Sequence, residues 1–215
     1  MTHPLEEART KANEKLGNTL VEALKKKEYQ AVYAPDREKA LEEVLKLIPK
    51  GASVGVPGTV TIRQIGAMEA LAEHGCTVHH HWKQLTPEQK PQVFMDEYGA
   101  DYFLTSANAI TRDGIIVNID GTGNRVSAMA WGDNTMIFVI GLNKVAGTLE
   151  EAINRARSAT PPNVIRLGGD TPCIQTGYCL DCQSPARVCR AMLILERPTF
   201  GRKVHVIIVG ENLGY

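Results

Sequence analysis

Four cysteines gathered in one short segment carry the most distinctive chemistry of this chain. Cys173, Cys179, Cys182 and Cys189 follow the pattern C-x(5)-C-x(2)-C-x(6)-C. Thiolates are soft ligands, and four of them in a compact loop suit tetrahedral zinc or a cubane cluster. Structural zinc sites usually pair two C-x(2)-C knuckles across an intervening segment, whereas only Cys179 and Cys182 form one here. We therefore predict that residues 170–190 form a cysteine-rich metal loop holding an iron-sulfur cluster of the 4Fe-4S kind, with zinc as the alternative.

A second interpretation of these cysteines needs no metal. They would be reduced, partly buried thiols, or Cys179 and Cys182 would form a redox pair. Structural disulfides are not expected, because the N-terminus lacks the apolar segment of a secretory signal and the cytosol keeps thiols reduced. No run of about 18 apolar residues predicts a membrane span either. The expected location is cytoplasmic.

Polar residues follow two neighbouring apolar strands and predict one shared pocket. Asp120 has the chemistry of a general base or of a group that positions a substrate hydroxyl, and Arg125 that of a bidentate partner for carboxylate or phosphate. We predict these two as the catalytic residues. The alternative is a hairpin whose turn and caps use them structurally. The predicted substrate-binding residues are Gly55, Gly58, Thr59, Ser106, Asn108, Asn118, Gly121, Asn124 and Asp133.

The turn at residues 55–59 lies where a strand meets a helix, so its backbone N–H groups and the Thr59 hydroxyl are suited to an anion. A tight structural turn is the alternative. Neither a Walker A loop nor a dinucleotide fingerprint is present, so NAD and ATP are not predicted. His79, His80 and His81 alternate in direction on a strand, which favours a solvated or substrate-facing loop over a metal site.

Strands and helices alternate along the chain, which predicts an α/β fold. The expected architecture has three layers, a mostly parallel sheet with helices on both faces. The Asp113-Gly114 turn predicts one antiparallel hairpin within that sheet. Ligands of such sheets bind beyond the carboxyl ends of the strands. Helices are predicted at residues 4–27, 36–47, 62–74, 94–98 and 149–158, and strands at 31–34, 53–56, 77–80, 102–106, 115–119, 136–140, 191–196 and 204–209.

Length and charge set further bounds. A chain of 215 residues fits one domain, residues 1–215, with residues 1–28 as an N-terminal helical extension. Lys plus Arg and Asp plus Glu both number 24, so the net charge of zero gives no general attraction for nucleic acid or for an anionic membrane.

Four segments resemble the LUD domain of lactate-utilisation proteins. They are residues 55–58, 105–111, 118–125 with the sequence NIDGTGNR, and 209–214. The cysteine loop is similar to that of a stand-alone subgroup of the family. The resemblance implies a fold similar to the sugar-phosphate isomerase and CoA-transferase superfamily. It also implies an association with oxidation of L-lactate to pyruvate in multi-subunit, iron-sulfur-containing systems.

Three functional hypotheses follow. The first is iron-sulfur-linked redox metabolism of a small carboxylate such as lactate, with other lactate-utilisation or electron-transfer subunits as partners. The second is a non-redox isomerase or acyl/CoA transferase that acts on a small carboxylated or phosphorylated substrate and carries a structural zinc. The third is a regulatory binding module without turnover. The sequence leaves open whether the chain is an enzyme and whether it forms homo-oligomers.

Overall fold

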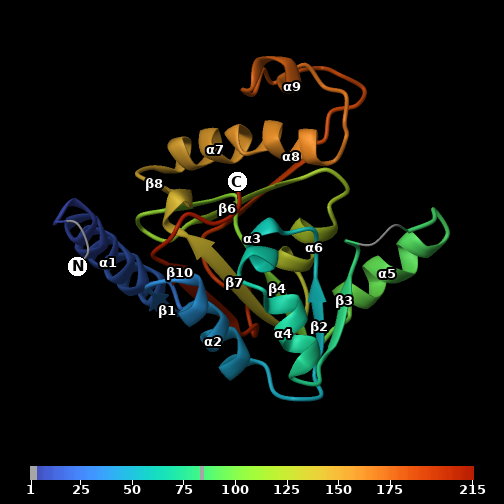
Figure 1. Cartoon of the computed structure of the whole chain (residues 1–215). Coiled ribbons are helices and arrows are strands. Elements are labelled where there is room, and N and C mark those ends of the chain that lie inside the picture. The colour runs from blue at the N-terminus through green and yellow to red at the C-terminus, as the bar shows by residue number, and fades with distance from the viewer. Residues whose placement is uncertain (1–3, 83–84) are drawn as a thin grey trace.

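The computed structural model describes residues 4–82 and 85–215, which form two β-sheets with helices packed on them (Figure 1). Residues 1–3 of the predicted extension lie outside the described residues. The elements are α1 (Pro4–Lys26), β1 (Gln30–Ala34), α2 (Arg37–Leu47), β2 (Ser53–Val56), α3 (Val60–Gln64), α4 (Ala67–Glu73), β3 (Thr77–His80), α5 (Gln89–Tyr98), β4 (Tyr102–Thr105), β5 (Ala109–Thr111), β6 (Ile116–Asp120), α6 (Asn124–Ala130), β7 (Thr135–Gly141), η1 (Leu142–Lys144), β8 (Val145–Ala146), α7 (Leu149–Ser158), α8 (Thr160–Arg166), α9 (Cys173–Thr176), β9 (Ala191–Leu195) and β10 (Val204–Val209).

The main sheet has six parallel strands in the order β1-β10-β7-β4-β2-β3. Its central strands are apolar throughout because both faces are covered. In β7, Met136 and Phe138 join the core that includes side chains of α1 and α6. The intervening Ile137 and Val139 join the core under α2, α3 and α4 on the other face. The predicted mostly parallel sheet with helices on both faces is therefore confirmed.

The predicted hairpin exists but lies outside the main sheet. β5 and β6 pair antiparallel around the turn at Asp113 and Gly114, where Gly114 has a φ of +90°. They belong to a second sheet with the order β8-β5-β6-β9, so its expected place within the first sheet was wrong. The reason is tertiary, because β6 pairs with the distant strand β9 and α7 covers the outer face of this sheet.

The helix predicted at residues 62–74 is also wrong as a single element. The chain forms α3 and α4 instead, and Gly66 separates them with a φ of +69° in the left-handed region. Glycine adopts this conformation without steric cost, so the chain changes direction there.

The remaining helices surround the two sheets. α1 lies against β1, α5 lies against β3 near the opposite end of the main sheet, and α7 and α8 lie over the second sheet (Figure 1). Among the helices at residues 4–82 and 85–215, none combines the length and the apolar character needed to cross a membrane.

Gly55 allows α5 to approach β2 closely. A Cβ at this position would lie 1.9 Å from the backbone carbonyl oxygen of Glu97, and backbone does not yield as a flexible side chain does. Gly55→Ala is therefore expected to lower the free energy of unfolding by about 2–3 kcal/mol. Urea denaturation measures this change, and a stability within about 0.5 kcal/mol of the natural chain would contradict the packing described here.

Candidate functional site

A cavity of about 290 Å³ opens where several strands of the main sheet and the second sheet end. The turn after β2 contributes Gly58 and Thr59, and the loop after β4 contributes Ser106. Lys144 follows β7, and α8 contributes Asn163 and Arg166. The pocket therefore lies where parallel α/β sheets usually bind ligands, beyond the carboxyl ends of the strands.

The predicted polar residues only partly converge on this pocket. Those that line it are Gly58, Thr59, Ser106, Asn108, Asp120, Gly121, Asn124 and Arg125. Gly55, Asn118 and Asp133 are not among the lining residues. Gly55 faces α5, as described above, and the charge of Asp133 favours the protonated form of Arg202.

Asn108 and Asn118 connect β6 to the loop before β5 through their side chains. The Asn118 Oδ1 accepts from the Asn108 backbone N–H at 3.1 Å, and the Asn108 Oδ1 accepts from the Ile119 N–H at 2.9 Å. These amides extend the pairing of the two strands. Asn118 is buried and its Nδ2 has no hydrogen-bond partner among the described residues. Its predicted substrate contact stays a prediction.

Lys144 is the deepest charged residue of the pocket and is 3% exposed. Its Nζ donates to the Thr61 Oγ1 at 2.9 Å and to the Ser106 Oγ at 2.8 Å. In the part of the chain that the structure describes, no carboxylate lies within ion-pair distance of this nitrogen. Burial, together with the charges of Arg155 and Arg125, lowers the pKa of Lys144 from 10.5 to about 7.

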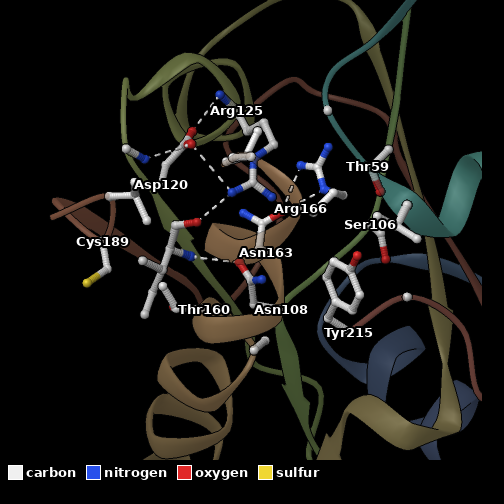
Figure 2. Close-up of a pocket in the computed structure, with 18 of the residues that line it drawn as sticks. Thr59, Ser106, Asn108, Asp120, Arg125, Thr160, Asn163, Arg166, Cys189 and Tyr215 are labelled. Carbon is white, nitrogen blue, oxygen red and sulfur yellow. Dashed lines mark hydrogen bonds and ion pairs between the residues drawn. The ribbon is translucent and has the colours of Figure 1, made fainter. Parts of the chain in front are cut away.

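Two arginines continue the cationic lining toward the surface. The Arg125 side chain is 17% exposed and donates to the Ile119 carbonyl oxygen at 2.5 Å. Arg166 is exposed, and its Nη2 donates to the Asn163 Oδ1 at 2.8 Å. The guanidinium of Arg166 also lies 4.8 Å from the centre of the Trp82 ring. Figure 2 shows both arginines in the pocket, with Asp120 beside Arg125, and with Thr59, Ser106 and Tyr215 on the other side of Arg166.

Asp120 is the one side-chain carboxylate among the described lining residues, and its oxygens are already occupied. Oδ2 accepts from the backbone N–H groups of Arg125 at 2.8 Å and Val126 at 3.3 Å. Oδ1 accepts from the Gly121 N–H at 3.0 Å and lies 3.4 Å from the Arg125 Nη2. The carboxylate thus holds the first turn of α6. The geometry favours this positioning role, and the general base remains a sequence prediction.

Asp120→Asn is expected to lower the free energy of unfolding by about 1–2 kcal/mol, because the amide loses the charge that strengthens these hydrogen bonds. Thermal or urea denaturation measures the change. Asp96→Asn is the matched control, since Asp96 accepts from Gln92 on the exposed face of α5. Unchanged stability of the Asp120 variant would count against the positioning role and in favour of the predicted base.

His81 and Glu97 form a second polar pair beside the pocket. The His81 Nδ1 lies 2.7 Å from the Glu97 Oε1, and Glu97 is 2% exposed. Burial raises the pKa of Glu97, and the contact with His81 opposes that rise. The His81 ring lines the pocket next to Gly58, where a Cβ would lie 2.8 Å from its Nε2. His81 therefore faces the pocket, and the solvated or substrate-facing loop that the sequence favoured over a metal site stays a prediction.

The four cysteines do not form a ready metal site. The Cys173 Sγ is buried and lies 3.1 Å from the Thr171 Oγ1, and the Cys179 Sγ accepts from the Asp181 N–H at 3.4 Å. Within residues 4–82 and 85–215, no three His, Cys, Asp or Glu side chains are grouped closely enough to hold a metal ion. The donor atoms as placed therefore do not fit a cluster or a zinc ion. In Figure 2 the sulfur of Cys189 points away from Asp120.

The cysteine segment is held by charged contacts of its own. Arg187 donates to the carbonyl oxygens of Cys182 at 2.8 Å and Cys189 at 2.9 Å. Asp181 accepts from Arg187 and from Arg157 of α7, each at 2.7 Å. The loop is thereby attached beside the pocket, which Cys189 lines.

Sequence reasoning missed Lys144 and the His81–Glu97 pair as functional candidates. Lys144 offered a signal, since a lone lysine follows the apolar strand at residues 136–140 in the position where ligand-binding loops begin. Glu97 offered none, because its role depends on a contact between two separate elements.

Comparison with known proteins identifies relatives of this fold. Residues 18–209 match the profile of a family described as the LUD domain. A crystal structure of a DUF162 family protein from Deinococcus radiodurans is similar, with a TM-score of 0.54 and 13% identity over 92% of this chain and 98% of that chain. The tetrameric eIF2B-beta2-delta2 complex from C. thermophilum matches with a TM-score of 0.35 and 11% identity, over 52% of this chain and 44% of that chain, which is too weak to support an argument. No curated protein matches significantly.

Proposed function

The chain belongs to the LUD domain family, and on this premise we propose that its pocket binds a small 2-hydroxy- or 2-oxocarboxylate of the lactate and pyruvate type, in the service of lactate utilisation. One observation supports the proposal above the others. The described residues that line the pocket include the guanidinium groups of Arg125 and Arg166 and the amine of Lys144, against one side-chain carboxylate, that of Asp120, which is already hydrogen-bonded. Such a lining favours an anion.

The size and polarity of the pocket fit a compact ligand. A cavity of about 290 Å³ is at the lower end of the range for small-molecule sites. Arg166 offers a guanidinium suited to bidentate pairing with a carboxylate, because the hydrogen-bond partner of its Nε and Nη2 is the neutral Asn163 and the guanidinium lies over the Trp82 ring. At the deep end of the pocket lie the Lys144 amine and the hydroxyl groups of Thr61 and Ser106, which are suited to bind the oxygen on C2 of the ligand.

Calorimetric titration with pyruvate, L-lactate and inorganic phosphate tests the proposal. Pyruvate or lactate is expected to bind, and Arg166→Gln is expected to weaken binding at least about tenfold, because it removes a charge-assisted hydrogen bond. Arg197→Gln is the control, since Arg197 is exposed and pairs with Glu28. Binding of phosphate without either carboxylate would overturn the proposal and favour the phosphorylated substrate of the second hypothesis.

The iron-sulfur cluster and the electron-transfer partners remain predictions from the sequence. We assign no step of the chemistry to a cluster, because the thiols are not brought together here. Metal and acid-labile sulfide analysis of protein purified without oxygen decides the matter. Iron with equivalent sulfide, lost on replacement of the four cysteines by serine, would establish the cluster. Zinc alone would support the structural zinc of the second hypothesis.

A further inference from the structure

The hydrogen bonds of Lys144 match a neutral amine better than an ammonium ion. An ammonium ion has three N–H donors and no lone pair. The Nζ has two acceptors, the hydroxyl oxygens of Thr61 and Ser106, and no further partner among the described residues. A neutral amine that donates to both hydroxyls retains one lone pair. That lone pair is available for chemistry, because Nζ borders the cavity.

The surroundings of Lys144 disfavour its charged form. The side chain is almost fully buried, and the nearest groups that the structure describes around Nζ are hydroxyls rather than carboxylates. The charges of Arg155 and Arg125 act in the same direction as burial. A lysine desolvated and placed near other cations is the usual arrangement that makes an amine nucleophilic near neutral pH.

We propose that Lys144 is a nucleophilic amine that forms an imine with the C2 carbonyl of a 2-oxo acid bound in this pocket. The inference rests on the proposed function, because the cationic lining brings the carboxylate of the ligand next to the amine. It distinguishes the two ligand classes. A 2-oxo acid presents a trigonal C2 to the lone pair, whereas the saturated C2 of a 2-hydroxy acid cannot react.

The reaction balances without an oxidant or a reductant. The Nζ lone pair attacks C2, and the carbonyl oxygen takes up a proton to give a carbinolamine. The C–O bond then breaks, the hydroxyl leaves as water with the second amine proton, and a C2=N bond remains. One water is released for each imine. The Ser106 and Thr61 hydroxyls lie 2.8 and 2.9 Å from the nitrogen and are placed to pass these protons.

An imine has a chemical consequence that can be observed. Once the imine nitrogen takes up a proton from solvent, the C2=N group withdraws electrons, so a proton on C3 is released to water more readily. The electron pair of the C3–H bond moves into a new C2=C3 bond, and the π pair of the C2=N bond moves onto the nitrogen. Return of a solvent proton to C3 restores the imine. In heavy water the protein is therefore expected to exchange the methyl protons of pyruvate for deuterium, which proton NMR detects.

Reductive trapping tests the proposal directly. The folded protein is incubated with pyruvate and sodium cyanoborohydride, and intact mass and peptide mapping follow. A single N-carboxyethyl adduct, the reduced imine, is expected on Lys144, and an excess of L-lactate is expected to suppress it. Lys144→Met is expected to lose the adduct and the methyl exchange. Lys46→Met, at an exposed lysine of α2 paired with Glu43, is the matched control and should retain both.

The outcomes separate this inference from the proposed function. Calorimetric binding of pyruvate without an adduct on Lys144, or with adducts scattered over exposed lysines, would overturn the imine and leave the binding pocket standing. Absence of both binding and adduct would overturn both proposals. Should Lys144→Met fail to fold, Ser106→Ala provides a second test of the imine. It keeps the amine but removes one hydroxyl relay, so trapping should be slowed severalfold while lactate suppression persists.

Discussion

Lys144→Met is expected to change the pH dependence of stability strongly. The pKa of Lys144 falls from 10.5 to about 7 on folding. Between these values the unfolded chain binds a proton that the folded chain does not, so the stability of the natural protein rises as pH rises. Below about pH 7 the burial of Lys144 lowers the free energy of unfolding by its full amount, and above pH 10.5 this destabilisation is absent. At about 1.36 kcal/mol per pKa unit, the cost near neutral pH is about 4–5 kcal/mol.

Methionine removes this titration while filling similar volume. It also leaves the Thr61 and Ser106 hydroxyls without their nitrogen partner, which costs about 1–3 kcal/mol at every pH. The variant should therefore be more stable than the natural chain near pH 7, and this advantage should shrink by about 4–5 kcal/mol toward pH 10.5. Urea denaturation of both proteins from pH 7 to 10 measures the difference.

Lys46→Met provides the control for this series, because Lys46 is exposed and its ion pair with Glu43 is open to solvent. Its stability should run parallel to that of the natural chain across the same pH range. If the Lys144 and Lys46 variants gave parallel curves, Lys144 would not be held in a medium that disfavours its charge. A stable variant that no longer binds pyruvate would show that the buried amine is retained for function at a cost in stability.

The architecture of the main sheet was accessible from the sequence because local patterns determine it. Apolar, β-branched runs such as residues 136–140 alternate with amphipathic helices, and this order implies parallel strands with both faces covered. The second sheet was not accessible. It depends on the pairing of β6 with β9, strands separated by some seventy residues of chain, and no local pattern encodes that contact. The break at Gly66 was missed because a glycine inside a helical pattern is often tolerated.

The candidate site was predicted where a single rule sufficed. The loops after β4 and β6 were expected to share a pocket because they follow neighbouring strand ends, and Ser106, Asn108 and Arg125 do line one cavity. The rule gives positions and not roles. Asp120 has a reactive side chain, but its backbone partners in α6 became visible only in the structure. The function of Lys144 depends on burial, which composition does not disclose.

For the cysteine segment, the sequence indicates the type of ligand atom but not how the sulfur atoms are arranged. Its residue types indicate soft ligands, but spacing does not determine whether the sulfur atoms meet. Arg187 and Asp181 hold the segment through carbonyl and carboxylate contacts, and among the described residues no three of its thiols are grouped for a metal ion. A cluster would require the segment to close around it, because metal binding and folding of such loops are coupled.

Arg202→Met is expected to lower the free energy of unfolding by about 3–5 kcal/mol. Arg202 is 8% exposed, and its Nη1 donates to the Ala128 and Met129 carbonyl oxygens at 2.5 and 3.2 Å. Its Nε donates to the Asn134 carbonyl oxygen at 3.1 Å, and its Nη2 to the Asn134 side chain. The cation thus satisfies the carboxyl end of α6.

Methionine would leave several buried carbonyl groups without a donor, each at about 1–3 kcal/mol. Arg197→Met is the matched control, because Arg197 forms an exposed ion pair with Glu28, and its replacement should lower the free energy of unfolding by less than about 1 kcal/mol. Arg202→Lys should fall between the two, since an ammonium group cannot reproduce the planar fork of donors. Because Arg202 holds the end of α6, amide hydrogen exchange in residues 124–130 should also accelerate in the Arg202 variant. This helix carries Arg125 of the pocket. Equal stability of the Arg202 and Arg197 variants would contradict the role of this arginine in holding α6, and with it the pocket, in place.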